Sequence, residues 1–502
     1  MDTIKTRFAP SPTGWLHVGG ARTALFNYLL ARQAGGTFLL RIEDTDLARH
    51  DESAVAKIID DLVWLGIEWD EGVEVGGDNG PYRQSERLGI YTEHIGRLLD
   101  SGRAYYAFET PEELDAMRAD ARAEKRNFRY PRPGPLPTAA DADKARAAGR
   151  PVVVRFKIPA RDVTIHDEVF GEVTVAAGEQ DDFIIQKTAP DGQAAWPTYH
   201  LANVVDDAMM GVNFVCRGQE FLSQTWRHVL LREAFGFTEP KYAHLPLIMD
   251  MKGRKLSKRD GAVEVHAFRT AGYLPEVLVN FIALLGWSPG GNIEQLTMDD
   301  LVDAFSVNRI NKANAKFDRQ KLLAFNTVAV APRRGFAPEV ELWEKFKEFL
   351  DLNETAIPKD NPRMLKRLIG ANPGFRTFKD ILDKCNVLFV ADDAFEYDKK
   401  AVDRFLARGN GVGYSVLAEL MPGLAKLTES PDPADNKWKS QEFHSLFEEI
   451  FAKRAVGMGK VAQPIRVAVT GTTISPEIYN TLAILGKDKT LARIDRCLAM
   501  RE

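Results

Sequence analysis

The chain has few cysteines and no long apolar run. Only three cysteines, Cys216, Cys385 and Cys497, occur in 502 residues, and they are far apart. A scattered, odd-numbered set argues against a disulfide framework and favours a reducing, cytoplasmic environment. No CxxC pair or Cys/His cluster has the spacing of a structural zinc site. Because no stretch of about 18 apolar residues occurs and the first residues do not resemble a secretory signal, we expect no membrane segment.

An excess of basic charge is also missing. The net charge is −5 and the isoelectric point is near 6.1, which gives no support to nucleic-acid binding, because phosphates are bound by Lys and Arg. The 66 Lys and Arg side chains are nevertheless enough to form one basic face. The hydrophobic content of 45% and charged content of 27% are typical of a globular protein. The length predicts several domains, about three or four.

The order of predicted elements indicates a split α/β domain with an insertion and a helical tail. Residues 3–42 have the pattern strand, helix, strand, which predicts a βαβ unit of a parallel sheet. From about residue 110 to 188 a charged helix and a proline-rich stretch precede several short strands, which predicts an α+β insertion. A second βαβ pattern covers 196–237, and helical periodicity dominates from about 274 onward. No internal repeat is found.

The turn "PSPTGWLHVGGAR" lies between the first predicted strand and helix. A helix that begins near Gly20 offers unpaired N–H groups and a positive dipole end, which attract phosphate. Glycines such as Gly19 and Gly20 let a ligand touch the backbone, and His17 could donate a hydrogen bond to a phosphate oxygen. Taken alone, the motif is more typical of an ordinary turn with a surface histidine. Neither GxGxxG nor GxxxxGK[ST] occurs in the chain.

A second motif, "GRKLSKRDG", follows the second βαβ pattern. Lys255 and Lys258 supply point charges for a polyphosphate, and Ser257 adds a hydroxyl donor. Alone, this string is typical of a solvated basic loop. Together with the upstream HVGG turn and the two βαβ patterns, it predicts a nucleotide-phosphate site.

Longer segments of the chain occur in a recognisable order, namely "PSPTGWLHVGGARTALFNYLLAR", "FLLRIEDTD", "PYRQSERLGIYTEHIGRLL", "PTYHLANVVDDAMMG", "HLPLIMDMKGRKLSKRDGAV", "YLPEVLVNFIALLGWSP" and the stretch from "GMGKVAQPIRVAV" to the end. Together they resemble the glutamyl-tRNA synthetases of bacterial type, which are class I aminoacyl-tRNA synthetases. HVGG stands where that class has its HIGH signature, and KLSKR where it has KMSKS. The resemblance covers nearly the whole chain.

The resemblance implies a multidomain α/β fold. It comprises a split Rossmann-like catalytic domain with a parallel sheet, an α+β insertion, a stem-contact region and an all-α anticodon-binding domain. The expected boundaries are 1–108 and 193–250 for the two catalytic halves, 109–192 for the insertion that binds the tRNA acceptor end, 251–325 for the stem-contact region with the KLSKR loop, and 326–502 for the helical domain.

The implied reaction has two steps. The α-carboxylate of glutamate attacks the α-phosphate of ATP to give glutamyl-adenylate and pyrophosphate, and then the 2′-OH of the terminal adenosine of tRNA(Glu) displaces AMP. Neither step needs an enzyme nucleophile, because in-line displacement is helped mainly by positioning and preorganised charge. The resemblance assigns catalytic roles to His17, Lys255 and Lys258, and ATP binding to these with Gly19, Gly20 and Ser257. Mg²⁺ is expected with the ATP.

The substrate also explains a second set of residues. Glutamate has two carboxylates and one ammonium, which two arginines and one carboxylate would complement. Arg7 and Arg217, at the ends of apparent strands, suit the carboxylates, and Glu43 suits the ammonium. By resemblance, Ser11, Tyr199 and Asn203 belong to the same pocket. Without the flanking motifs, Arg217 would be interpreted as a surface ion-pair residue and Tyr199 as a core aromatic residue.

The sequence departs from the family pattern in three places. The insertion reads "AYYAFET" where many relatives have zinc-binding cysteines, so we expect no zinc. Residues 218–221 read "GQEF" after Arg217, where a more acidic "RGxDH"-like run is expected, which affects the pocket and the contacts with the acceptor end. Gly374 aligns with an arginine that reads the last anticodon base in enzymes specific for tRNA(Glu). A glycine there would also admit tRNA(Gln), although Arg376 is only two positions away.

Four other interpretations were weighed. A glutaminyl-tRNA synthetase would need a β-barrel tail, and the short paralogue that glutamylates a modified tRNA base would end after the catalytic domain. A small-metabolite adenylyltransferase would have no use for the insertion and tail. A catalytically inactive RNA-binding homologue would not need intact HVGG and KLSKR motifs. The expected partners are therefore L-glutamate, ATP and tRNA(Glu), with tRNA(Gln) as a further candidate, for a monomer in the cytoplasm with no membrane contact.

Overall fold

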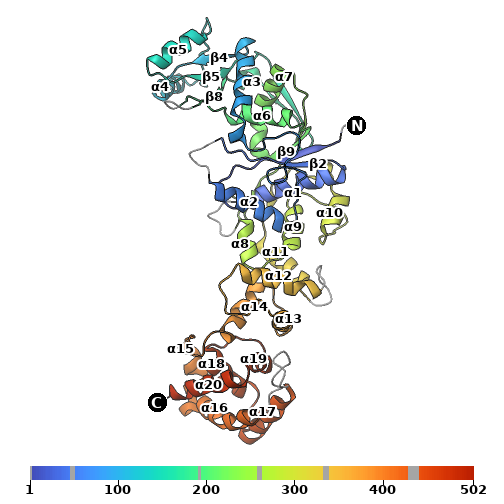
Figure 1. The fold of residues 1–502 in the computed structure, drawn as a ribbon, viewed down its shortest axis with the longest axis vertical. Helices are drawn as coiled ribbons and strands as arrows, with labels where there is room; N and C mark the ends of the chain where they lie inside the picture. The colour runs from blue at the N-terminus through green and yellow to red at the C-terminus, as the bar shows by residue number, and fades with distance from the viewer. Residues whose placement is uncertain are drawn as a thin grey trace. The chain divides into compact units, whose positions relative to one another are not determined.

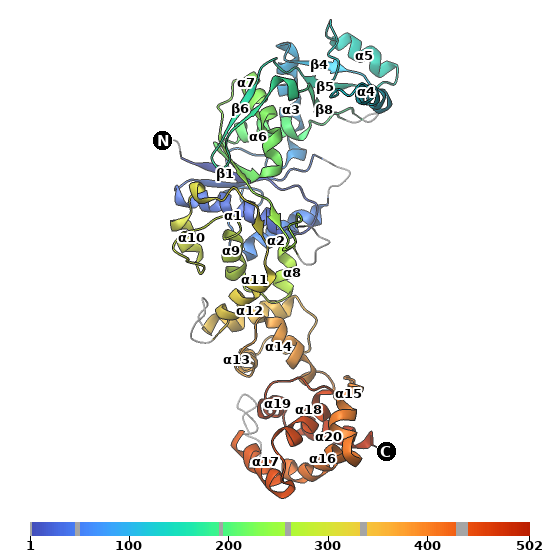
Figure 2. The ribbon, with the colours of Figure 1, turned by 180° about the vertical axis from the view of Figure 1, so that it is seen from behind.

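The computed structural model describes residues 3–45, 51–189, 194–256, 263–331, 339–427 and 440–501 (Figure 1). The chain forms two compact units. The first comprises Met1–His266 and Leu278–Asp318, and the second comprises Ala267–Val277 and Arg319–Glu502. Figure 2 shows the same ribbon from behind. Within the described ranges, no helix has both the length and the apolar character needed to cross a membrane.

The predicted N-terminal βαβ unit is confirmed. Strands β1 (Lys5–Phe8), β2 (Thr37–Leu40) and β3 (Glu71–Gly72) form a parallel sheet in that order, and helix α1 (Val18–Gln33) connects the first two. The apolar side chains at helical spacing in α1 are buried, as the pattern requires. The helix begins two residues before Gly20, because His17 caps it with its side chain.

A second sheet has the strand order β7-β6-β10-β9. Its strands are β6 (Val163–Asp167), β7 (Gly171–Val175), β9 (Phe214–Gly218) and β10 (Lys241–Leu245). Strand β10 is parallel to both β9 and β6, whereas β6 and β7 form an antiparallel hairpin. This hairpin lies inside the expected insertion 109–192 but is hydrogen-bonded to the second catalytic half. The sheet of the second catalytic half therefore includes strands from both sides of the expected boundary at residue 192.

The α+β part of the insertion contains an antiparallel sheet in the order β4-β5-β8, whose first strand precedes the expected boundary at residue 109. Two helices that begin with capping boxes pack beside it, and their N-cap residues are Thr110 for α4 and Thr138 for α5. Small apolar clusters lie under them. The bounds are β4 (Ala104–Ala107), α4 (Pro111–Ala123), α5 (Ala139–Ala147), β5 (Val153–Phe156) and β8 (Phe183–Gln186).

The first unit also contains further helices and one more parallel pair of strands. Helices α2 (Glu52–Trp64), α3 (Leu88–Asp100), α6 (Tyr199–Met209), α7 (Thr225–Phe235) and α10 (Met298–Ala304) belong here, with the parallel pair β11 (Ile248–Met249) and β12 (Ala315–Lys316). Helices α8 (Val265–Thr270) and α9 (Pro275–Ala283) each include residues of both units.

The second unit is helical, as the periodicity predicts, and its described residues contain no strand. Its core includes Arg493 of α20, whose buried guanidinium donates to Val469 O and pairs with Asp392. The helices are α11 (Arg319–Ala329), α12 (Glu339–Asp351), α13 (Pro362–Gly370), α14 (Phe378–Cys385), α15 (Lys399–Val402), α16 (Arg408–Lys426), α17 (Ser440–Arg454), α18 (Gly459–Thr470), α19 (Ile478–Leu485) and α20 (Lys487–Ala499).

Candidate active site

A cavity of about 520 Å³ lies at the carboxyl ends of β1 and β9, beside the start of α1. In open α/β sheets, ligands bind at this edge. The structure brings together at this cavity every described residue that the sequence assigned to ATP or glutamate: Arg7, Ser11, His17, Gly19, Gly20, Glu43, Tyr199, Asn203, Arg217 and Lys255. The other two predicted residues, Ser257 and Lys258, lie outside the described residues.

His17 is the N-cap residue of α1. Its Nδ1 accepts a hydrogen bond of 3.1 Å from the Gly19 N–H group. An imidazole nitrogen that accepts carries no proton, so a neutral His17 has its proton on Nε2. The cap therefore orients the ring and fixes the tautomer of the neutral imidazole.

The two glycines of HVGG have helical backbones rather than strained ones. A Cβ on Gly19 would meet only His17 Nδ1, at an ordinary 3.5 Å, so the fold itself does not require a glycine there. On Gly20 a Cβ would lie 3.0 Å from Leu16 Cδ1, which is tight. Within the described part of the chain, the Gly20 N–H group makes no hydrogen bond. This free donor at the positive end of the helix dipole suits an anion.

Backbone pairing brings the two signature motifs together. On one side of segment 257–262, Lys255 pairs with Met249 and the Leu256 N–H donates to Ile248 O at 3.0 Å. On the other side, the Val18 N–H donates to Val263 O at 2.9 Å. The described residues on both sides of segment 257–262 are thus hydrogen-bonded near the cavity, Leu256 to β11 and Val263 to the start of α1.

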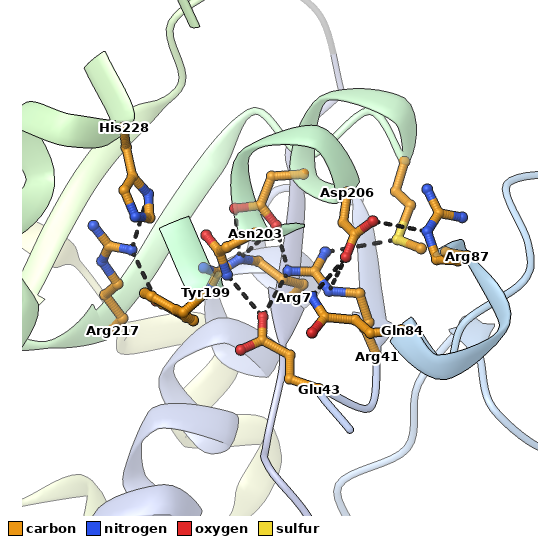
Figure 3. Close-up of polar contacts among 12 residues, drawn as sticks. Arg7, Arg41, Glu43, Gln84, Arg87, Tyr199, Asn203, Asp206, Arg217 and His228 are labelled. Atoms are coloured by element: carbon orange, nitrogen blue, oxygen red, sulfur yellow. Dashed lines mark hydrogen bonds and ion pairs between the residues drawn. The ribbon is translucent and has the colours of Figure 1, made fainter. Parts of the chain in front are cut away.

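Glu43, which also lines the cavity, accepts hydrogen bonds from Asn203 Nδ2 at 2.8 Å and from Arg41 at 3.1 Å (Figure 3). Burial raises the pKa of Glu43 above the ordinary carboxyl value, although Arg41 and Asn203 act in the opposite direction. Its position at the end of a parallel strand, beside a free cavity, suits an ammonium group.

Behind Glu43 lies a buried charge network that sequence reasoning missed. Arg41 is 2.8 Å from Asp207 and 3.6 Å from Asp206, and Arg7 Nε is 3.2 Å from Asp207. Asp206 also accepts from Arg87 Nε at 2.7 Å. Burial raises the pKa of Asp207, but Arg7 and Arg41 outweigh it and hold the pKa at about 2. The acidic pair Asp206-Asp207, which directly follows the apolar Val204-Val205 in helix α6, is the signal that could have revealed this network.

The charges of this network balance, since three arginines face three carboxylates: Arg7, Arg41 and Arg87 against Glu43, Asp206 and Asp207. Gln84 and Tyr91 complete the hydrogen bonds of Asp206. A buried network of this kind orients its members. It leaves the two terminal nitrogens of Arg7, which make no hydrogen bond to any described residue, at the cavity.

Arg217 differs from these arginines. It is only 4% exposed, and its partners are Tyr199 OH, Thr225 Oγ1, His228 Nδ1 and His244 Nε2. Among the described residues it forms no ion pair with a carboxylate. A buried guanidinium without such a partner is unfavourable unless a ligand supplies the negative charge.

The departure at residues 218–221 is also visible here. Glu220 and Phe221 line the cavity, and the Phe221 ring lies 5.4 Å from the Tyr199 ring and 5.3 Å from the Arg217 guanidinium. Phe221 therefore supplies an aromatic wall where the family pattern has a histidine.

Comparison with known proteins decides the family. Residues 3–324 match the family model described as tRNA synthetases class I (E and Q), catalytic domain, and residues 341–498 match the model of an anticodon binding domain. The chain belongs to the class I glutamate–tRNA ligases. It is 40% identical to the glutamate–tRNA ligase of Carboxydothermus hydrogenoformans, over 98% of this chain and 99% of the relative. It is 39% identical to that of Geobacter sulfurreducens, over 100% of both chains.

A solved structure of a similar protein supports the same family assignment. The glutamate tRNA ligase from Elizabethkingia meningosepticum, in complex with its amino acid, has a TM-score of 0.76 and 33% identity over 100% of both chains. The predicted fold class is confirmed, namely a class I catalytic domain with a parallel sheet followed by a helical anticodon-binding domain. The relatives match over their full length, which excludes the short paralogue and the small adenylyltransferase. The chain is thus an ATP-dependent aminoacyl-tRNA synthetase.

Proposed function

We propose that this glutamate–tRNA ligase binds glutamate with Arg7, Glu43 and Arg217, and activates it at the start of α1. The single observation that carries the proposal is the state of Arg217, which is buried at the cavity with no carboxylate partner among the described residues. A carboxylate of the substrate would supply the missing charge.

The remaining groups complement the rest of the substrate. The terminal nitrogens of Arg7 face the cavity and suit the second carboxylate, while Glu43 suits the ammonium. Tyr199 and Asn203 hold Arg217 and Glu43 in place and, with Ser11, complete the proposed pocket. Because the network behind the pocket is neutral, the preference for an anionic amino acid comes from Arg217.

The proposed ATP site lies on the other side of the cavity. His17 Nε2 and the Gly20 N–H group are donors for phosphate oxygens, and Lys255 adds positive charge. Ser257 and Lys258 belong to the proposal as continuations of the same loop. These donors stabilise the charge that develops when the α-carboxylate of glutamate attacks the α-phosphate and pyrophosphate departs.

Magnesium is proposed as a companion of ATP rather than as a metal held by the protein. Among the described residues there is no group of three or more His, Cys, Asp or Glu side chains that could hold a metal ion. Mg²⁺ commonly binds to substrate phosphates and water with few protein ligands, which fits this donor set.

The test is Arg217→Gln, with Arg32→Gln as the control. Arg32 is a half-exposed arginine of α1 that pairs with Asp70. Loss of a hydrogen-bonded charge pair of about 1.5–3 kcal/mol raises the KM for glutamate roughly 10- to 150-fold. The assay is ATP–pyrophosphate exchange with glutamate and tRNA(Glu). An unchanged KM for glutamate in folded Arg217→Gln would refute the assignment.

We also propose that the enzyme charges tRNA(Gln) in addition to tRNA(Glu). Gly374 lies exposed in the turn between α13 and α14, with a φ of +85°, and a Cβ added there would meet nothing within 4 Å. Because glycine has no side chain, nothing at this position would exclude a tRNA whose anticodon ends in a different base. Arg376, two residues further on, is turned toward Asp380, with Nε and Oδ2 3.2 Å apart.

The test compares Gly374→Arg with Gly374→Ala for the charging of purified tRNA(Glu) and tRNA(Gln). Both variants carry the strain of a positive φ, roughly 1–2 kcal/mol, so their difference isolates the guanidinium. We expect Gly374→Arg to lose activity on tRNA(Gln) while Gly374→Ala keeps it. Equal losses on both tRNAs in Gly374→Arg would contradict the proposal.

A further inference from the structure

We infer that Asp167 and His244 form a positioning pair for Arg217, which fixes the orientation of its guanidinium. The inference rests on the proposed role of Arg217 in binding a carboxylate of glutamate. Neither residue lines the cavity, and both belong to the strands behind it, Asp167 to β6 and His244 to β10.

Asp167 is a buried carboxylate, and both of its oxygens accept hydrogen bonds from neighbouring groups. Its Oδ1 accepts from the backbone N–H groups of Val169 and Phe170, at 3.0 and 2.8 Å. Its Oδ2 accepts from the His244 backbone at 3.1 Å and contacts the His244 Nδ1 at 2.6 Å. Both oxygens of Asp167 therefore act as hydrogen-bond acceptors.

This carboxylate determines the proton position on His244. Nδ1 must be the donor to Asp167, so in the neutral ring Nε2 is an acceptor. Nε2 lies 3.1 Å from Arg217 Nε, whose N–H can only donate. Burial lowers the pKa of His244, which favours the neutral ring, although Asp167 acts in the opposite direction. The chain of hydrogen bonds runs in one direction, from Arg217 through His244 to Asp167.

Two contacts hold one edge of the Arg217 guanidinium. Nε donates to His244, and the adjacent terminal nitrogen Nη2 donates to Thr225 Oγ1 at 2.8 Å. Thr225 in turn is 2.9 Å from Phe221 O, to which its hydroxyl can donate. The other terminal nitrogen, Nη1, has only longer contacts, 3.3 Å to Tyr199 OH and 3.4 Å to His228 Nδ1. The held edge thus leaves donors for a ligand.

The contact of Arg217 with Asp167 through His244, and not directly, matters for ligand binding. A carboxylate in direct contact with Arg217 would compete with the carboxylate of the substrate for the same donors. Asp167 contacts His244 and not Arg217, so it orients the guanidinium without taking a donor that a ligand could use. Because Asp167 lies on the β6–β7 hairpin, that hairpin takes part in the amino-acid site although none of its residues reaches the cavity.

The experiment compares His244→Leu with His244→Gln. Leucine removes the acceptor for Arg217 Nε, whereas the amide oxygen of glutamine can replace it. We expect His244→Leu to raise the KM for glutamate roughly 10- to 100-fold, with the KM for ATP within about twofold of wild type. His244→Gln should restore the KM for glutamate to within about fivefold of the wild-type value. Asp167→Asn, which keeps the shape and removes the charge, should give an intermediate KM.

The Arg217→Gln variant and the double variant with His244→Leu complete the design. If His244 acts through Arg217, the second substitution adds little to the first, and the double-mutant cycle is strongly non-additive. A rise in KM in Arg217→Gln but not in folded His244→Leu would overturn this inference alone. The same holds if His244→Gln is as impaired as His244→Leu, or if both substrates' KM values rise equally. An unchanged KM in Arg217→Gln would overturn the proposed function together with this inference.

Discussion

Gly19→Ala separates folding from ATP binding at the start of α1. Gly19 is the second residue of the helix, and an added Cβ would meet only His17 Nδ1, at 3.5 Å. Since nothing clashes and alanine is the better helix former, the free energy of unfolding should stay the same or rise by up to about 1 kcal/mol. The protein alone therefore tolerates the methyl group.

ATP binding should respond in the opposite direction. A phosphate oxygen bound to the Gly20 N–H group would lie about 2.9 Å from that nitrogen, and a methyl group on the preceding residue competes for the same space. The loss of one charge-assisted hydrogen bond, about 1.5–3 kcal/mol, raises the KM for ATP roughly 10- to 150-fold. The KM for glutamate should change much less, because Arg7, Glu43 and Arg217 are untouched.

A matched control exists in α3. Gly89 is also the second residue of its helix, and a Cβ there would meet nothing within 4 Å. Gly89→Ala should change stability by the same amount and leave the KM for ATP unchanged. Urea unfolding and ATP–pyrophosphate exchange with glutamate and tRNA(Glu) measure the two quantities. The reasoning is refuted if Gly19→Ala has a KM for ATP within about twofold of Gly89→Ala.

Three further predictions concern pH, the buried network and metal. Burial lowers the pKa of His200 to about 3, below its value near 6.5 in the unfolded chain. The free energy of unfolding should therefore fall as the pH falls from about 6.5 towards 3, by up to about 1.4 kcal/mol per pH unit. Hydrogen exchange of α6 between pH 6 and 5 should show such a slope, and His200→Gln should reduce it, with the remainder coming from His228 and His244, whose pKa values burial also lowers. Asp206→Asn removes a charged partner of buried arginines and should reduce the stability of the first unit by about 3–5 kcal/mol. Glu52→Gln, at the exposed ion pair with Arg83, should change the stability by less than about 1 kcal/mol. Equal effects of the two substitutions in urea unfolding would contradict the role of the buried network. Treatment with a chelator followed by Mg²⁺ should restore full charging activity without zinc, and a need for added zinc would disprove the prediction that the insertion binds none.

Local pattern was sufficient for much of the fold. The N-terminal βαβ unit follows from apolar spacing and the Gly35-Gly36 stop, and the tail helices follow from their periodicity, since both depend on neighbours in sequence. The start of α1 was predicted two residues late, because histidine is not a preferred N-cap and its role depends on the orientation of one ring. The β6–β7 hairpin was placed wholly in the insertion, because strand pairing over long distances leaves no local mark.

The amino-acid sequence by itself predicted the family, and it predicted a set of site residues that includes Arg7, Glu43 and Arg217. The structure places the described members of this set at one cavity. Only the tertiary structure decided which charges are already neutralised. Arg7 meets Asp207, whereas Arg217 meets no carboxylate among the described residues and is hydrogen-bonded to His244 instead. Electrostatic pairing depends on distances of a few ångströms between residues far apart in the chain, so no pattern along the sequence could distinguish the two arginines.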